Sequence, residues 1–196
     1  MDRLIALFPR WVKPNHLTFL RLGLSLFMLV LEFGGGDLGL IILCGLAAGF
    51  SDLLDGALAR RRGLTTALGA FLDPVGDKLF ALVMAVILWH RSLVAAWLLL
   101  SLLVTEVHTV LVPLLVMARR LARRRPLWPP PQVVPNRWGK LKTGWLAASL
   151  GLVAIAHWMG QGWLVQFAVW NIYLGLALGL VAEVKYLADW YRGAYE

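Results

Sequence analysis

Six long apolar stretches decide what this chain can fold into. They cover residues 17–33, 38–50, 69–89, 92–117, 144–158 and 163–187. A helix needs about 20 mainly apolar residues to cross the hydrocarbon of a bilayer, and the second stretch reaches that length only by continuing through Asp52 and Asp55. Hydrophobic residues make up 60% of the 196-residue chain, too many for an ordinary soluble domain. We predict an all-α integral membrane protein, a single domain over residues 1–196 with six transmembrane helices.

Basic residues predict how these helices are oriented. With six spans, the Lys and Arg residues near both termini, between the second and third spans and between the fourth and fifth spans fall on one side of the membrane. Because basic residues accumulate on the cytoplasmic side, we expect both termini there. Residues 1–13 mix apolar and basic side chains and are predicted to form an interfacial helix. Residues 118–138 are predicted to form a basic, Pro-rich cytoplasmic loop.

The net charge of +8 raises the question of a nucleic-acid partner. The basic residues lie beside the predicted spans and no nucleic-acid motif accompanies them, so anchoring to anionic lipid head groups accounts for the charge. We therefore expect membrane lipids and no nucleic acid as partners. An apolar helix face left exposed would also suit a homodimer. The single cysteine, Cys44, cannot form an intramolecular disulfide.

Four aspartates interrupt the apolar background. Asp52 and Asp55 follow the second apolar stretch, and Asp73 and Asp77 lie inside the third. Carboxylates in membrane spans are costly and mark functional sites. Residues three or four apart share a helix face, so each pair forms a stripe. The short basic turn at Arg61 makes the two helices antiparallel neighbours, so we expect the four carboxylates to converge.

Converging carboxylates need a counter-charge. Mg²⁺ and Mn²⁺ prefer oxygen ligands, and two such ions about 3.5 to 4 Å apart commonly assist displacement at phosphorus. We therefore predict a site for two divalent ions. Gly56 and Gly69 remove bulk beside the acids, and Arg60 supplies a charge suited to a diphosphate. The glycines could also serve only close packing of membrane helices, and the sequence leaves both interpretations open.

The aspartate run resembles the signature of a known enzyme family. From Asp52 to Asp77 it reads D-x2-D-G-x2-A-R-x8-G-x3-D-x3-D, and every fixed position of the CDP-alcohol phosphatidyltransferase motif is present. Residues 14–21, 73–78 and 139–143 resemble segments of the phosphatidylglycerophosphate synthase and cardiolipin branches. The resemblance implies attack of an alcohol on the lipid-linked phosphate of CDP-diacylglycerol, with release of CMP. It also implies a bacterial inner-membrane enzyme whose active site faces the cytoplasm.

The same resemblance implies roles for individual residues. One ion would be held by Asp52, Asp55 and Asp73, and the other by Asp52, Asp73 and Asp77. Asp77 would also be the catalytic base that takes the proton of the incoming hydroxyl. The CDP group would be bound by Asn15, Thr18, Gly56, Arg60, Thr66 and Gly69, although Asn15 also suits a helix cap. The acceptor would be bound by Lys140, Lys142, Arg137 and Glu106, although the two lysines suit a lipid anchor nearly as well.

The acceptor alcohol is the least constrained part of this prediction. Glycerol 3-phosphate is the first expectation, but the branch that uses it usually has an Arg-Glu pair where this chain has Thr105 and Glu106. The alternatives are phosphatidylglycerol, as in a cardiolipin synthase of the same fold, inositol phosphate and serine. A divalent-cation transporter would be a different class of protein with intramembrane carboxylates. The clustering of the acids at one membrane face argues against a transport path.

Overall fold

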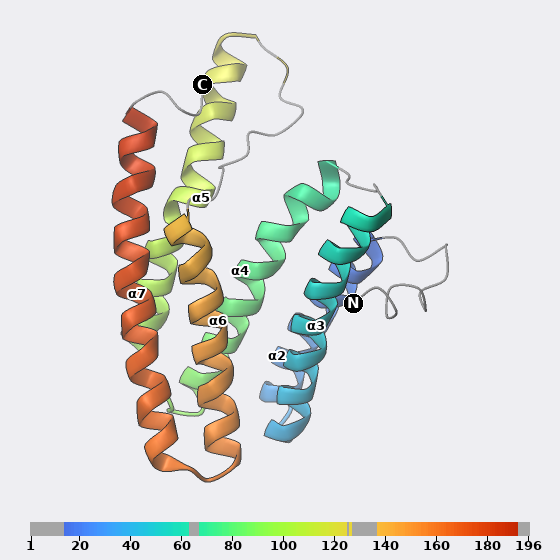
Figure 1. The fold of residues 1–196 in the computed structure, drawn as a ribbon, viewed down its shortest axis with the longest axis vertical. Coiled ribbons are helices and arrows are strands. Elements are labelled where there is room, and N and C mark those ends of the chain that lie inside the picture. Colours follow the sequence, from blue (N-terminus) through green and yellow to red (C-terminus); the bar gives the residue numbers. More distant parts are fainter. Residues whose placement is uncertain (1–13, 63–66, 125, 127–136, 192–196) are drawn as a thin grey trace. The chain divides into compact units, whose positions relative to one another are not determined.

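Helices form the regular structure of the part of the chain that the structure describes. The computed structural model describes residues 14–62, 67–124, 126 and 137–191. Its helices are α2 (Pro14–Phe33), α3 (Leu38–Arg62), α4 (Ala67–His90), α5 (Ala96–Ala122), α6 (Arg137–Trp158) and α7 (Gly162–Tyr191), as Figure 1 shows. Each contains most of one predicted apolar stretch, and α3 continues through Asp52 and Asp55 as expected. The all-α class is therefore confirmed.

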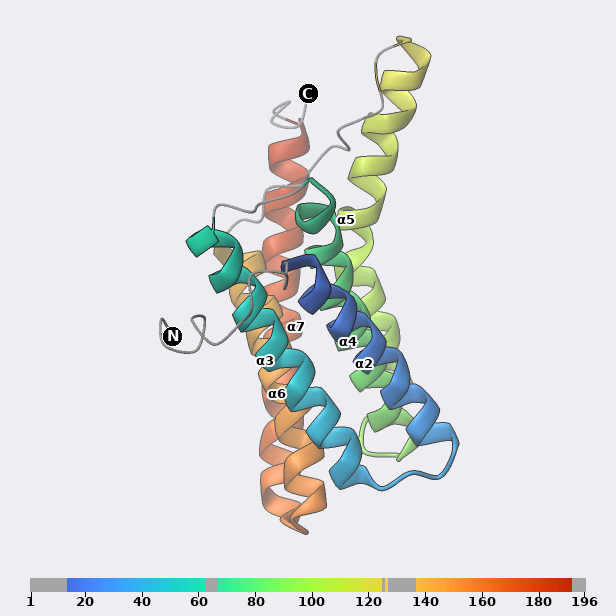
Figure 2. The ribbon, with the colours of Figure 1, turned by 90° about the vertical axis from the view of Figure 1, so that its right-hand side faces the viewer.

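Contacts divide the chain into two compact units, Met1–Ile87 and Leu88–Glu196. In the first unit α2 and α3 lie side by side as a helical hairpin (Figure 2). In the second unit α6 and α7 form another hairpin, and α5 contacts α7. Each unit is thus built around one pair of closely packed helices.

A short glycine turn closes each hairpin. Gly35, between α2 and α3, has a φ of 75°, and Gly160, between α6 and α7, has a φ of 70°. Both angles lie in the left-handed region, which a glycine adopts without strain and which commonly ends a helix. Asp37 caps the start of α3, since its Oδ1 accepts a hydrogen bond from the backbone N–H of Leu40 at 3.2 Å. These turns reverse the chain and make the paired helices antiparallel.

A glycine lies at a helix contact in each hairpin, and the approach leaves no room for a side chain at Gly175. A Cβ atom added to Gly45 on α3 would lie 3.5 Å from the methyl carbon of Met28 on α2. A Cβ atom added to Gly175 on α7 would lie 2.7 Å from a methyl carbon of Leu146 on α6. Van der Waals packing of this kind, with small residues at the contact, holds helices together where lipid removes the hydrophobic driving force.

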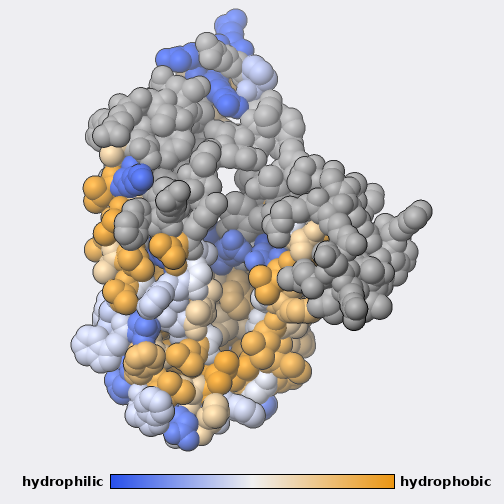
Figure 3. Space-filling view, viewed as in Figure 1, coloured by the Kyte–Doolittle hydropathy of each residue, from blue (hydrophilic) through white to orange (hydrophobic). Residues whose placement is uncertain are grey.

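Apolar side chains cover much of the described surface (Figure 3). Val30, Leu43 and Leu180 are each more than half exposed. Among the described residues, Asn15–Phe33, Leu38–Leu58 and Gly162–Lys185 are long and apolar enough to cross a membrane. Large exposed apolar patches mark contact with lipid or partners, so this is a membrane protein with apolar helices. Six spans with both termini in the cytoplasm remains a prediction.

Helix boundaries around the basic segment differ from the prediction. α5 continues to Ala122, into the predicted 118–138 loop, because Arg119 and Arg120 suit the negative end of a helix and the prolines begin only at Pro126. α6 begins at Arg137, ahead of the apolar stretch at 144–158. The predicted interfacial helix at 1–13 and residues 127–136 of the predicted loop lie outside the described residues.

Candidate active site

An arginine joins two of the predicted metal-binding carboxylates. Arg21 extends from α2, and its Nη1 atom donates to Oδ1 of Asp77 on α4 at 2.9 Å. The same Nη1 atom also donates to Oδ1 of Asp52 on α3. The Arg21 side chain is 2% exposed, whereas those of Asp52 and Asp77 are 45% and 43% exposed. The cation is therefore buried, while the two carboxylates that neutralise it remain accessible.

A second polar contact lies one turn along the hairpin. Thr18 Oγ1 donates to Oδ2 of Asp55 at 3.3 Å, and both residues are buried. Thr18 and Arg21 are three residues apart on α2, and Asp52 and Asp55 are three apart on α3. In antiparallel helices this spacing places the two contacts on successive turns of one interface. Asp52 and Asp55 thus share a helix face, and that face is turned toward α2.

Apolar residues surround these contacts and hold them in place. Leu17 on α2 packs in one buried cluster with Leu54, Ala57 and Leu58 on α3. These residues alternate along the helices with Thr18 and the two aspartates. A shift of α2 along α3 that exchanged the partners of the polar groups would therefore break this close-packed apolar contact.

Gly76 makes room for the guanidinium of Arg21. A Cβ atom added to Gly76 would lie 2.7 Å from Nη2 and 2.9 Å from Nε of Arg21. A glycine in a helix interior lowers stability by roughly 1 kcal/mol relative to alanine, so its presence in α4 needs a compensating contact. Here the guanidinium lies against the helix backbone next to Asp77. One turn of α4 supplies both the space and one of the carboxylates.

The donor atoms gathered at this site suit a hard divalent cation. Asp52 and Asp77 present carboxylate oxygens from two helices to one shared cation, the ligand type that Mg²⁺ and Mn²⁺ prefer. Within the described part of the chain, no three acidic, His or Cys side chains are grouped closely enough to hold a metal ion. The side chain of Asp73, on α4, lies outside the described residues. The donor chemistry therefore fits the ion, and the convergence of four aspartates remains a prediction.

The other predicted nucleotide-binding residues belong to the same part of the chain. Asn15 is partly buried on α2, one turn before Thr18, and Gly56 follows Asp55 on α3. Arg60 lies near the end of α3 and Gly69 near the start of α4, with side-chain surroundings outside the described part. Thr66 lies outside the described residues altogether. Nucleotide binding by this group remains a prediction.

The predicted acceptor-binding residues all belong to the second unit. Lys142, near the start of α6, is 3% exposed. Arg137 and Lys140 lie before it on α6, and Glu106 lies on α5, but nothing of their side chains is described. A buried lysine in an apolar helix requires polar company, which a substrate pocket or an internal ion pair can supply. Their role at the acceptor stays a prediction.

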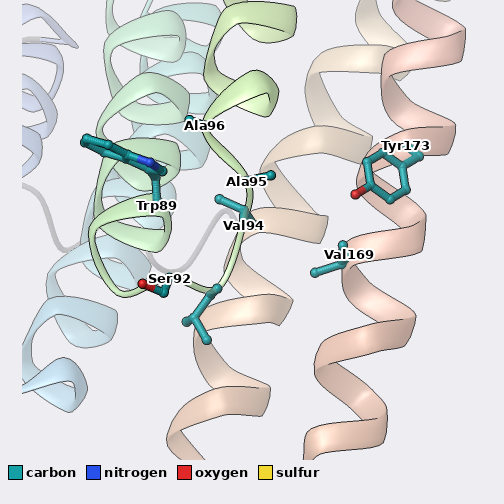
Figure 4. Close-up of a pocket in the computed structure, with 8 residues that line it drawn as sticks. Trp89, Ser92, Val94, Ala95, Ala96, Val169 and Tyr173 are labelled. Carbon is teal, nitrogen blue, oxygen red and sulfur yellow. The ribbon is translucent and has the colours of Figure 1, made fainter.

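A cavity of about 400 Å³ lies in the second unit, between the end of α4 and α7. Its lining is Trp89, Ser92, Leu93, Val94, Ala95, Ala96, Val169 and Tyr173 (Figure 4). The ring of Tyr173 stacks on Trp97 with centroids 5.3 Å apart, and Trp170 meets it edge-on at 5.5 Å. This lining has no carboxylate, imidazole or amine, so the cavity supplies neither a metal ligand nor a base. Aromatic residues grouped at helix ends suit a membrane interface.

Arg21 is the residue of this candidate site that the aspartate motif does not include. Its sequence position carries a signal, because it is the only charged residue between 17 and 31 in the first apolar stretch. An arginine inside a span, three residues after a threonine on the same face, indicates a polar interior. Its partners are 31 and 56 residues away along the chain, so pairing becomes visible only when the helices are placed.

Comparisons with known proteins identify the family of this chain. Residues 11–181 match the model of the CDP-alcohol phosphatidyltransferase family. The chain is 39% identical over 160 residues to a cardiolipin synthase (CMP-forming) of Streptomyces coelicolor, covering 79% of this chain and 69% of that protein. It is 31% identical over 180 residues to a probable phosphatidylglycerophosphate synthase of Mycobacterium tuberculosis, covering 89% and 79%. This membrane protein therefore belongs to the CDP-alcohol phosphatidyltransferase family and is a transferase of phospholipid biosynthesis.

Proposed function

We propose that the protein transfers the phosphatidyl group of CDP-diacylglycerol to the free hydroxyl of phosphatidylglycerol, which makes cardiolipin and releases CMP. The observation that carries the acceptor is the 39% identity to a cardiolipin synthase over most of both chains. The Thr105–Glu106 pair, where glycerol 3-phosphate enzymes usually have Arg-Glu, supports the same choice.

Glycerol 3-phosphate is the second candidate acceptor. The 31% identity to a probable phosphatidylglycerophosphate synthase extends over 89% of the chain, and the Gly139–Thr143 segment resembles that branch. Arg137, Lys140 and Lys142 would then bind the acceptor phosphate, with Glu106 nearby. Both acceptors offer a glycerol hydroxyl to the same phosphorus, so the chemistry of the aspartates is common to the two.

Asp52, Asp55, Asp73 and Asp77 would hold the metal ions of a family that is generally metal-dependent. Two Mg²⁺ or Mn²⁺ ions would neutralise the diphosphate and polarise the phosphorus when bound. Asp77 accepts the proton of the acceptor hydroxyl, for which it must come within about 3 Å of that oxygen. The new bond joins this oxygen to the lipid-linked phosphorus, and the bond to the CMP oxygen breaks. Asn15, Thr18, Gly56, Arg60, Thr66 and Gly69 hold the CDP group.

The membrane placement predicted for the site supports this proposal. By the positive-inside rule, the ends of α3 and α4 that carry the aspartates would lie on the cytoplasmic side. Asp52 and Asp77 are each more than two-fifths exposed, so a substrate can reach them. A site at that depth meets a lipid from the bilayer and releases CMP into water.

An acceptor panel tests this proposal. Purified full-length protein receives CDP-diacylglycerol and Mn²⁺ or Mg²⁺ with one alcohol at a time: phosphatidylglycerol, glycerol 3-phosphate, inositol phosphate or serine. We expect CMP release with phosphatidylglycerol and none after chelation of the metal. Release with glycerol 3-phosphate alone would make the second candidate correct. Uptake of Mn²⁺ into proteoliposomes without CMP release from any alcohol would contradict the enzyme and indicate a transporter.

A further inference from the structure

The contact of Arg21 with Asp52 and Asp77 has a consequence for the metal site. Both acids belong to the ligand set proposed for one of the two ions, so Arg21 and that ion use neighbouring or identical carboxylate oxygens. Arg21 is 2% exposed and its guanidinium carries a permanent charge. A site that already contains a cation presents less negative charge to a second one.

We propose that Arg21 is an internal competing cation, which neutralises Asp52 and Asp77 when no divalent ion is bound and thereby lowers the affinity of that ion. This inference rests on the metal site of the proposed function. It differs from a passive support role, in which Arg21 would hold the carboxylates in place and increase metal affinity.

The geometry favours exchange over passive support. The Nη1 atom of Arg21 contacts both Asp52 and Asp77, so a small movement of the guanidinium would release both carboxylates together. Asp52 and Asp77 are 45% and 43% exposed, so an approaching ion reaches them from the open side while Arg21 stays on the buried side. Asp55 accepts a hydrogen bond from Thr18, and the two carboxylates that Arg21 contacts come from α3 and α4.

Gly76 sets how far the guanidinium can reach. With no side chain at this position, the arginine head lies where a Cβ atom would come within 2.7 Å of Nη2. An alanine there would displace the guanidinium while the charge of the protein stays unchanged. Gly76→Ala therefore weakens the contact between the guanidinium and the carboxylates by moving the guanidinium, whereas Arg21→Gln removes the positive charge itself.

Equilibrium binding of Mn²⁺ to the full-length protein, without any lipid substrate, tests the proposal. Arg21→Gln is expected to bind Mn²⁺ roughly tenfold more tightly, because one unit charge beside the ligands is removed. Without Mn²⁺, the thermal midpoint of Arg21→Gln is expected to fall by about 5 °C, because two carboxylates lose their partner. Added Mn²⁺ should restore it.

Gly76→Ala is the second variant, which we expect to fold even if Arg21→Gln does not. It should bind Mn²⁺ about threefold more tightly than the unaltered protein. Arg119→Gln, an exposed arginine of α5, is the control for net charge and should match the unaltered protein.

Mn²⁺ affinity that is unchanged or weaker in both Arg21→Gln and Gly76→Ala would overturn the proposal and leave Arg21 as a support of the carboxylates. The same follows if Arg119→Gln gains as much affinity as Arg21→Gln. If the unaltered protein releases CMP with a suitable alcohol but these variants bind Mn²⁺ no more tightly, only this inference fails. If no form binds Mn²⁺, the proposed metal site fails and the inference falls with it.

Discussion

The two helical hairpins share an architecture and differ in what they bury. Both are antiparallel pairs closed by a left-handed glycine, at Gly35 and Gly160. The α2–α3 interface encloses Thr18, Arg21 and Asp55 next to its apolar residues. On α6 and α7 the fully buried side chains include Leu150, Val153 and Ile172, and Lys142 and Ser149 are buried polar residues there. Two helices can pair through complementary apolar packing alone, so the paired charges in the α2–α3 hairpin indicate a functional role.

The polar contacts of α2–α3 are costly to keep and easily lost. Arg21 loses nearly all of its contact with solvent, and direct contact with Asp52 and Asp77 helps to offset that loss. In α6–α7 the close approach of Leu146 to Gly175 involves no charge. We therefore expect conservative changes in the first hairpin to affect catalysis and changes in the second to affect folding.

Asp77→Asn gives the largest expected effect. The amide keeps the shape of the side chain but removes a base and a metal ligand, so turnover should fall by about 10²- to 10⁴-fold. Binding of CDP-diacylglycerol should persist, because the other aspartates and Arg60 remain. CMP release and equilibrium binding of the lipid are the two measurements. Asp37→Asn, at the exposed turn before α3, is the matched control and should leave turnover intact. Near-normal turnover in Asp77→Asn would remove this residue from the base role.

Gly175→Ala tests the apolar hairpin. The added Cβ would lie 2.7 Å from a Leu146 methyl carbon, and such overpacking lowers the free energy of unfolding by about 1–3 kcal/mol. Turnover per folded molecule and Mn²⁺ affinity should not change. Thermal unfolding in detergent, normalised against CMP release, measures both. Gly151→Ala on α6 is the matched control, since its added Cβ would meet nothing within 4 Å beyond its own stretch of helix backbone. A tenfold loss of turnover per folded Gly175→Ala molecule would show that α6–α7 also takes part in the chemistry.

Thr18→Val gives the smallest expected effect. Valine keeps the shape of threonine but removes the hydroxyl that donates to Asp55 at 3.3 Å. Loss of a group that orients a metal ligand should lower turnover or Mn²⁺ affinity by about tenfold. Ser25→Ala is the control, because the buried Ser25 hydroxyl donates to the Arg21 backbone oxygen within α2 and not to a carboxylate. Equal effects from the two variants would mean that general packing, and not the carboxylate, explains the loss.

The helices were predictable from sequence because each is encoded locally. Apolar runs of near-membrane length and the offsets of Asp52 and Asp55 depend on residues within one helix, and α3 has the predicted continuity. The end of α5 was not predictable from hydropathy, because basic residues continue a helix when they suit its C-terminus.

The contacts of the site depend on how helices pair, which the sequence does not encode locally. Thr18 reaches Asp55 across 37 residues, and Arg21 reaches Asp77 across 56. The motif identifies the acids because they lie close together in sequence. It says nothing of Arg21, whose role follows from an antiparallel register that a short glycine turn and small interface residues produce together.

The register of the α2–α3 hairpin limits how its length can be altered. One residue added inside α2 between Arg21 and the turn would rotate everything before it by about 100° relative to α3, and Arg21 would leave Asp52. Two full turns, about seven residues, added to both helices together would restore the alignment. The hairpin could therefore be fitted to a thicker bilayer only in matched steps of whole turns, with its metal chemistry carried along unchanged.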